Sequence, residues 1–224
     1  VRKWTEFVHG GWREYAGTAA AKAGVVKKTH PARREAEEAE RKRKEAEANR
    51  VREVAPTWTN VVEGGGCTLV WDGGALEKRG GKGDWNTGAF SNEAITRKEG
   101  GSESQGLKWR AATTNKSYEL GLSHEDGGVG GGKKDFGMWC DYDGYLYIFE
   151  QGSKVQGSGS FGSFAKYKAG DELEIRVVGD TVSYHQNGAL VHTSTRKPRF
   201  PLWADCSFYS PGARAEGVQL RCYA

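Results

Sequence analysis

The stretch "DELEIRVVGDTVSYHQNGALVHTS" (171–194) decides the fold class of this chain. In its "ELEIRVV" part (172–178) apolar residues alternate with charged ones, and a period of two is typical of a half-buried antiparallel strand. Two-residue hairpin signals follow at Gly179-Asp180 and Asn187-Gly188. The stretch therefore predicts three consecutive antiparallel strands, which need a larger sheet around them.

The same pattern extends over the whole region from Pro56 to the end of the chain. Short apolar runs alternate there with glycine turns, and the 224 residues include 33 Gly, 8 Trp and 9 Tyr. Many short strands at this spacing indicate a β-sandwich or barrel. Residues 56–224 are numerous enough to fill one hydrophobic core.

Five motifs in a fixed order resemble the concanavalin A-like jelly-roll module, which occurs as repeats in bacterial surface proteins and in large eukaryotic proteins. Together they cover nearly all of residues 57–222. The resemblance implies a mainly β protein, an antiparallel two-sheet sandwich, and a non-catalytic binding or architectural role. The motifs are "KGDWNTGAFS" (82–91), "YELGLS" (118–123), "KDFGMWCDYDGYLYIFEQG" (134–152), "KAGDELEIRVVGDTVSYHQNGALVHTS" (168–194) and "PLWADCSFYSPGARAEGVQL" (201–220).

Residues 31–55 predict an exposed α-helix, which forms an N-terminal extension of the sandwich. Pro31 opens the segment and Pro56 closes it, and Ala, Glu, Lys and Arg dominate between them. The segment has no wide apolar stripe, so it is either a solvated linker or a rod that docks along a neighbour. Pairs of opposite charge four residues apart support the helix at Glu37–Arg41, Glu38–Lys42 and Glu40–Lys44.

Residues 1–30 form an aromatic-containing arm. "WTEFVHGGWREY" (4–15) places Trp4, Phe7 and Val8 on one face if it is helical. A cluster of large apolar residues usually has a partner surface. The arm either folds back onto its own sandwich or docks into another protein, with Trp4, Phe7, Trp12 and Tyr15 as the anchors.

The positive charge lies in the N-terminal region. Residues 1–54 hold 14 basic and 9 acidic side chains, whereas residues 55–224 hold 19 and 20. Glutamates are interleaved with the basic residues, which argues against nucleic acid because phosphate neutralisation needs uncompensated charge. An acidic protein surface remains as a partner for Arg33, Arg34, Arg41, Lys42, Arg43 and Lys44.

The four cysteines do not predict a metal site. None belongs to a CxxC pair, and no histidine lies at ligand spacing from them. Cys140 and Cys206 lie in strand-like segments and are expected to be buried thiols. A disulfide between Cys67 and Cys222 stays open, since it depends on the compartment. No cofactor is expected.

Catalytic motifs are lacking, so we expect no enzyme activity. Glu172 and Glu174 share a strand face, but glycoside hydrolysis of this type needs a third carboxylate, and both are expected to be solvated. Ser123-His124 and Asp126 have no nucleophile elbow around them. His185 and His192 flank a turn without a third metal ligand. "GGVGGGKK" (127–134) lacks the phosphate-loop order and predicts a flexible loop.

Glycan binding is the alternative function. Lectin-like sites combine an aromatic platform with Asp and Asn side chains, often held by Ca²⁺. The competing interpretation is that Trp85 and Trp139 pack in the core and that Asp143-Gly144 is only a turn. The candidate glycan-binding residues are Asp84, Trp85, Asn86, Asp141 and Asp143.

The leading prediction is a non-catalytic structural or accessory subunit that docks into a larger protein assembly through its N-terminal arm and helix. No run of about 18 apolar residues is available to cross a bilayer. The first residues do not resemble a secretory signal peptide, and the first residue is not Met. The location stays open; if the N-terminus is a processed one, we expect an intracellular location in a mitochondrion, plastid or cilium.

Overall fold

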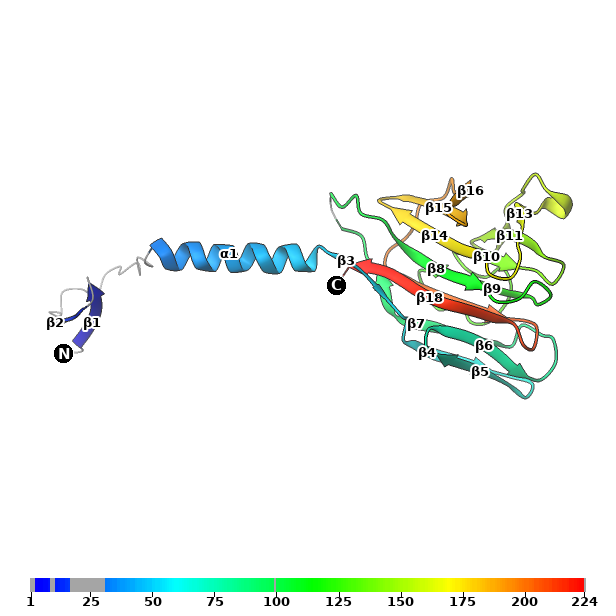
Figure 1. The fold of residues 1–224 in the computed structure, drawn as a ribbon, viewed down its shortest axis with the longest axis horizontal. Helices are drawn as coiled ribbons and strands as arrows, with labels where there is room; N and C mark the ends of the chain where they lie inside the picture. Colours follow the sequence, from blue (N-terminus) through cyan, green and yellow to red (C-terminus); the bar gives the residue numbers. More distant parts are fainter. Residues whose placement is uncertain (1–2, 9–10, 17–30, 99, 224) are drawn as a thin grey trace. The chain divides into compact units, whose positions relative to one another are not determined.

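The computed structural model describes residues 3–8, 11–16, 31–98 and 100–223, which form two compact units, Val1–Ala46 and Glu47–Ala224 (Figure 1). The first unit contains the antiparallel strands β1 (Lys3–Val8) and β2 (Gly11–Ala16). Trp4 lies opposite Tyr15 in this ladder, and Phe7 lies opposite Trp12. The expected helical face over residues 4–8 is therefore wrong, because aromatic and β-branched residues also favour strands.

The predicted helix is α1 (Pro31–Ala48), and its described side chains are exposed all round. The predicted ion pairs Glu38–Lys42 (2.8 Å) and Glu40–Lys44 (3.3 Å) are present, whereas Glu37 pairs with Arg33. The helix ends at Ala48 and not at residue 55. The following segment forms strand β3 (Val51–Val54), because it pairs with the far C-terminal end of the chain.

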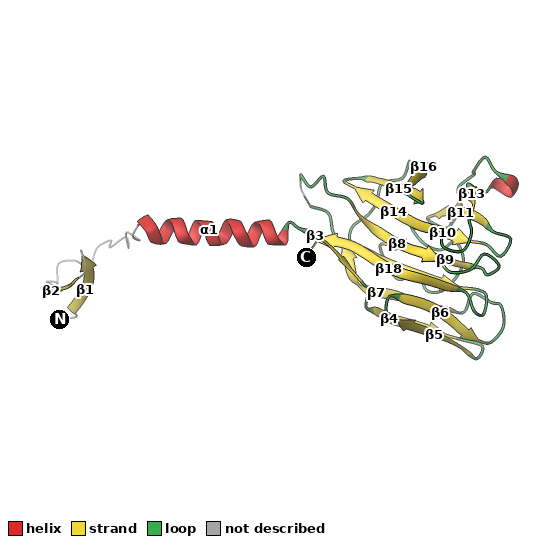
Figure 2. Cartoon of the chain, in the orientation of Figure 1, coloured by secondary structure: helices red, strands yellow, loops and turns green. Residues whose placement is uncertain are grey.

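Strand β3 belongs to one of the two sheets of the second unit. We call this sheet the back sheet, a name that does not refer to the view in Figure 2, and its strand order is β16-β15-β14-β8-β18-β6-β5. All its pairings are antiparallel, and β3 lies beside β18. The strands are β5 (Cys67–Asp72), β6 (Ala75–Gly80), β8 (Gln105–Ala111), β14 (Glu172–Val178), β15 (Thr181–Gln186), β16 (Ala189–Thr193) and β18 (Arg214–Tyr223).

The front sheet has the order β12-β11-β10-β9-β17-β7-β4, with β13 beside β11, and is also antiparallel throughout. A short 3₁₀ turn, Ser160–Gly162, precedes β13. The strands are β4 (Trp58–Glu63), β7 (Thr87–Ile95), β9 (Tyr118–Ser123), β10 (Phe136–Cys140), β11 (Tyr145–Glu150), β12 (Ser153–Lys154), β13 (Ala165–Lys166) and β17 (Leu202–Phe208).

The hydrophobic core lies between the two sheets. Alternate residues of each strand meet there, and both sheets contribute fully buried side chains such as Leu120 of β9 and Ile175 of β14. Two packed antiparallel sheets, together with an N-terminal helix, confirm the predicted mainly β two-sheet sandwich. The side chains on the outward face of each sheet do not take part in this core.

The stretch that decided the fold class forms β14, β15 and β16, as predicted. Asn187 and Gly188 both have positive φ, 50° and 78°, which the tight hairpin turn requires. Glu174 departs from the expectation of a solvated residue: it is 7 % exposed and pairs with Arg176 at 2.7 Å. Opposite charges on the outer face thus cover this carboxylate.

All four cysteines are free, buried thiols, so the alternative of a Cys67–Cys222 disulfide is not realised. Cys140 and Cys206 are 0 % and 1 % exposed, as expected for buried thiols in strands. Within the described ranges, no cluster of three metal-ligating side chains is present. The helix that the structure describes is not long and apolar enough to span a bilayer.

Candidate functional site

A row of aromatic rings covers the outer side of the front sheet, and we call it the aromatic face. Its members come from the loop before β7, from β10 and β11, and from the 3₁₀ turn. Except for Phe161, which is 79 % exposed, they are half-buried. The members are Trp85, Trp139, Tyr145, Tyr147, Phe149 and Phe161.

Ring contacts hold the row together. Trp139 packs edge-on against Trp85, with ring centroids 4.8 Å apart, and also contacts Phe149 at 5.2 Å. Further along β11, Tyr145 contacts Tyr147 at 6.4 Å and Phe161 at 5.9 Å. Phe161 has a φ of 56°, which is unusual for a residue with a large side chain. An exposed ring on strained backbone is a feature that often marks a functional surface.

Charged groups lie at the end of the aromatic face that is next to the turn between β10 and β11, which we call the β11 end. Asp141 and Asp143 border the turn between β10 and β11. Burial raises the pKa of Tyr147, and the Asp141 carboxylate raises it further. Asp141 Oδ1 accepts a hydrogen bond of 3.3 Å from the Ser117 hydroxyl. Lys154 lies over the Tyr147 ring at 4.0 Å, and Lys166 lies over Tyr145 at 5.1 Å. This end therefore offers both acceptors and donors beside flat apolar rings.

The glycine-rich segment 127–134 packs tightly onto the outer side of the front sheet. A Cβ on Gly131 would lie 2.6 Å from the Trp85 ring, and one on Gly132 would lie 2.6 Å from Phe149. Only glycine fits at such distances. The expected flexible loop is thus a packed segment, and its backbone N–H groups bind protein side chains.

A cluster of buried charges fixes this segment from below. Lys134 forms an ion pair with Asp205 at 2.9 Å and donates a hydrogen bond to Ser207. Glu119 accepts a hydrogen bond of 2.7 Å from the Gly132 N–H. Glu119 and Lys134 are 0 % exposed. Burial raises the pKa of Glu119 to about 7, although the Lys134 ammonium acts in the opposite direction.

A second buried lysine positions Trp85. Lys78 is 0 % exposed, and its ammonium donates to the Asp84 carbonyl at 2.7 Å and to the Asn86 side chain at 2.8 Å. It also donates to the carbonyls of Phe208 and Tyr209. The residues on both sides of Trp85 are thus tied to the end of β17.

The structure separates the predicted glycan-binding residues into two groups. Trp85 lies on the aromatic face, and Asp141 and Asp143 border its other end. Asn86 instead holds Lys78 through its side chain. Asp84 holds Lys78 through its main-chain carbonyl, and its exposed carboxylate accepts a hydrogen bond of 2.8 Å from the Trp85 N–H. The expectation that Trp85 and Trp139 pack in the core is wrong, since both lie on the outer side of the front sheet, where Trp139 follows Gly137 at alternate positions of β10.

The predicted docking residues lie in the first unit. The side chains of Trp4, Phe7, Trp12 and Tyr15 are outside the described part of the structure, although their backbone forms β1 and β2. The cationic residues lie on α1, where several are paired with glutamates of the same helix. They are Arg33, Arg34, Arg41, Lys42, Arg43 and Lys44.

Several residues of the site were missed at the level of sequence. Glu119 stands in the apolar run "YELGLS", and a charge inside a buried strand was a usable signal. Lys134 and Asp205 gave no signal, because they are distant from each other in the chain. Lys78 gave none, because two of its acceptors, the Phe208 and Tyr209 carbonyls, lie far along the chain. Phe161 was hidden in a loop-like segment.

The weighed catalytic groups are all engaged in structural contacts. Ser123 donates to Asp205 at 2.7 Å, and His124 Nδ1 lies 3.2 Å from the Pro201 carbonyl. His185 contacts Ser183 at 3.0 Å, whereas His192 packs on Phe164. Ser183 and His185 are thus a serine–histidine contact, but His185 Nδ1 has no hydrogen-bond partner among the described residues, so no third group orients the ring as in a triad.

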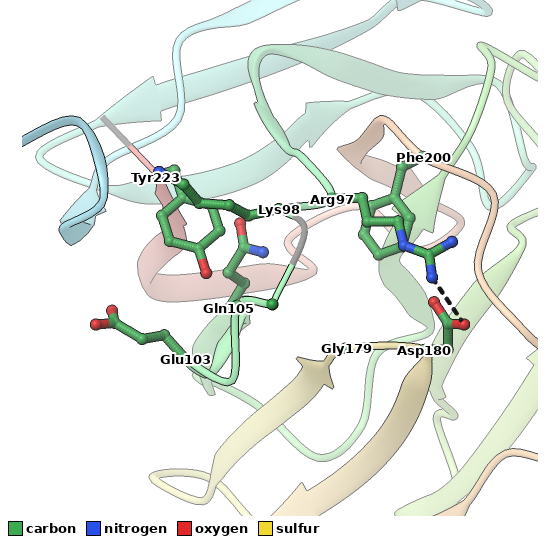
Figure 3. Close-up of a pocket in the computed structure, with 10 residues that line it drawn as sticks. Arg97, Lys98, Glu103, Gln105, Gly179, Asp180, Phe200 and Tyr223 are labelled. Atoms are coloured by element: carbon green, nitrogen blue, oxygen red, sulfur yellow. Dashed lines mark hydrogen bonds and ion pairs between the residues drawn. The ribbon is translucent and has the colours of Figure 1, made fainter. Parts of the chain in front are cut away.

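A pocket of about 530 Å³ opens at one end of the sandwich (Figure 3). The β7–β8 connection, the β14–β15 turn and the end of β18 surround it. Arg97 and Asp180 form an ion pair of 3.2 Å on one side, as the figure shows. Tyr223, Lys98 and Glu103 lie on the other side.

Comparisons with known proteins give structural likenesses only. No family model matches the chain, and no curated protein matches it either. Solved structures do match. The SPRY domain of human HERC1 is 14 % identical, with a TM-score of 0.49 over 70 % of this chain and 96 % of that one.

Two further structures differ in what their names state. The carbohydrate recognition domain of Emp46p is 13 % identical, with a TM-score of 0.47 over 75 % of this chain and 88 % of that one. A sialidase is 12 % identical, with a TM-score of 0.44 over 74 % of this chain but 16 % of its own. A carbohydrate recognition domain and a sialidase are thus both among the similar structures, and with these TM-scores below 0.5 the likenesses do not decide between binding and catalysis.

Proposed function

We propose that the sandwich is a non-catalytic binding module and that its aromatic face binds a glycan chain. The observation that carries the proposal is the row of partly exposed rings that ends beside Asp141 and Asp143. A sugar ring has one apolar C–H face and a rim of hydroxyl groups. The C–H face stacks on an aromatic ring, whose face is electronegative.

The charged groups at the β11 end supply the polar half of this recognition. Carboxylates accept hydrogen bonds from sugar hydroxyls, and Asp143 is exposed beside the turn. Lys154 and Lys166 add donors at the same end. Several rings in a row suit an extended chain of sugars better than a single unit, because each ring offers a separate stacking surface.

The test is a glycan array probed with the full chain, with and without Ca²⁺. We expect a defined set of glycans to bind. The binding should weaken at least about fivefold in Tyr145→Ala and Phe161→Ala, as expected when stacking worth about 1–3 kcal/mol is lost at an exposed site. Phe161 is 79 % exposed, so its loss leaves the core intact.

Trp71→Ala is the matched control. Trp71 is 47 % exposed on β5, which belongs to the other sheet. Its loss removes an exposed ring away from the aromatic face and should leave binding unchanged. An array without any bound glycan, or equal losses in all three variants, would refute the glycan proposal.

A second candidate function is docking into a protein assembly through the first unit. Its support is the β1–β2 ladder, in which Trp4 is opposite Tyr15 and Phe7 is opposite Trp12. Aromatic residues that are adjacent across a hairpin are frequent anchors of protein interfaces. Helix α1, exposed all round, then acts as a spacer.

Deletion of residues 1–30 tests this second function. The shortened chain should leave the native complex, whereas the full chain co-migrates with its partners on a sizing gradient. Equal co-migration of the two chains would remove the docking hypothesis and would leave the glycan proposal untouched.

A further inference from the structure

The pocket at the end of the sandwich is a separate site from the aromatic face, and charged and amide side chains line it. The two sites are built from different elements, since the pocket uses the β7–β8 connection, the β14–β15 turn and β18. Its volume of about 530 Å³ is in the range of small-ligand sites. Among the described residues, two cations and two carboxylates line it: Arg97, Lys98, Glu103 and Asp180.

Both cations already have partners. The Arg97 guanidinium donates to Asp180 at 3.2 Å. The Lys98 ammonium donates to the Ala48 carbonyl at 3.2 Å, where helix α1 ends, and lies over the Tyr223 ring at 5.0 Å. An anionic ligand would have to compete with these contacts.

The acceptors, in contrast, are incompletely used. Glu103 lines the pocket and forms no ion pair with any described residue. Burial is the main cause that raises the pKa of Tyr223, and the Glu103 carboxylate raises it further. Gln105 is 5 % exposed and donates through Nε2 to the Thr96 carbonyl at 2.9 Å. Its Oε1 has no hydrogen-bond donor among the described residues. A buried acceptor without a donor is destabilising by about 1–3 kcal/mol.

We propose that this pocket binds an arginine side chain presented by a peptide segment of a partner protein. The guanidinium group brings five N–H donors in a planar fork, which is what the free Glu103 carboxylate and the Gln105 carbonyl lack. The Oε1 atom is shielded in the unbound chain. The exposed Glu103 carboxylate therefore makes the first contact, and Gln105 Oε1 accepts a hydrogen bond only after its side chain has shifted toward the ligand.

The aromatic walls favour arginine over lysine. Phe200 and Tyr223 border the pocket, and a guanidinium plane stacks on such rings and is weakly hydrated. An ammonium group is more strongly hydrated. Because the Lys98 ammonium already lies over the Tyr223 ring, Phe200 is the ring left for the incoming guanidinium group.

The experiment is a ¹⁵N-resolved NMR titration of the full chain with acetyl-Gly-Arg-Gly-amide. We expect the peptide to shift the amide signals of Gly101 and Glu103 and the side-chain amide of Gln105. Glu103→Gln should weaken the binding roughly fivefold, as for loss of one exposed ion pair. The same peptide with Glu in place of Arg should leave these signals unchanged.

Glu125→Gln is the matched control, because Glu125 is an exposed glutamate outside the pocket. It should bind as the unmodified chain does. Three results would overturn the proposal: no shifts around the pocket, equal binding of the Glu peptide, or equal binding by Glu103→Gln. Methylguanidine is the final arm: binding as tight as that of the peptide would show that a free guanidinium compound, and not a peptide segment, is the ligand.

Discussion

Replacing Glu119 by Gln should change how the stability of the sandwich depends on pH. The Glu119 carboxyl is 0 % exposed, and burial raises its pKa from the ordinary 4.5 to about 7. The folded chain therefore binds a proton more tightly than the unfolded chain does. The stability that this group contributes is complete below pH 4.5 and is lost as the pH rises to about 7.

The size of this effect follows from the two pKa values. The interval from 4.5 to about 7, at roughly 1.4 kcal/mol per pH unit, corresponds to at most about 3 kcal/mol. Two charged groups face Glu119 in the cluster: Lys134 opposes the rise, and Asp205 adds to it. Asp205 is buried as well, and its own pKa is raised mainly by burial. The comparison of the two chains isolates Glu119, because both retain Asp205.

The assay is urea unfolding, followed by tryptophan fluorescence at several pH values between 4.5 and 8. The free energy of unfolding of Glu119→Gln should improve relative to the unmodified chain as the pH rises, by up to about 3 kcal/mol. Glu125→Gln, at an exposed position, should follow the unmodified chain at every pH. Parallel curves for Glu119→Gln and the unmodified chain would refute the reasoning, since Glu119 would then have the same pKa in both states.

Three further substitutions test the contacts below and beside the aromatic face. Lys134→Met leaves Asp205 buried without its cation and should lower the free energy of unfolding in urea by about 3–5 kcal/mol. The double variant Lys134→Met/Asp205→Leu should recover part of this stability. If it recovers none, the two residues are not coupled. Gly131→Ala places a methyl group 2.6 Å from the Trp85 ring, so it should lower the free energy of unfolding by about 1–3 kcal/mol and change the near-ultraviolet spectrum. The control is Gly127→Ala, whose nearest neighbour is 3.8 Å away and which should change neither quantity. Equal effects of the two substitutions would contradict the close packing. Lys78→Met removes the donor for four acceptors, so it should lower the free energy of unfolding by at least about 3 kcal/mol and alter Trp85 fluorescence. An unchanged fluorescence spectrum would argue against the role of Lys78 in positioning Trp85.

The parts of the fold that local pattern encodes could be predicted. The alternation in residues 172–178 and the Asn187-Gly188 turn act within a few residues, and both are present as β14 and the β15–β16 hairpin. The start of the helix at Pro31 is equally local. Such signals hold because the strand or turn needs no distant partner to define its geometry.

The end of the helix could not be predicted in the same way. Val51–Val54 contains Arg and Glu, which suit a helix, but its pairing partner is Leu220–Tyr223 at the other end of the chain. The site was harder still. Lys134 and Asp205 meet only because the loop after β9 crosses β17, and no spacing in the sequence encodes that contact.

Lys78 and Lys134 have no exposed surface, although lysine is the residue most readily labelled by amine-reactive reagents. In the folded chain both amino groups are therefore out of reach of an acylating probe, while the exposed lysines of helix α1 react freely. After brief labelling, peptide mapping should therefore find Lys78 and Lys134 acylated only in molecules whose sandwich has unfolded, so that the labelling of these two residues reports unfolding.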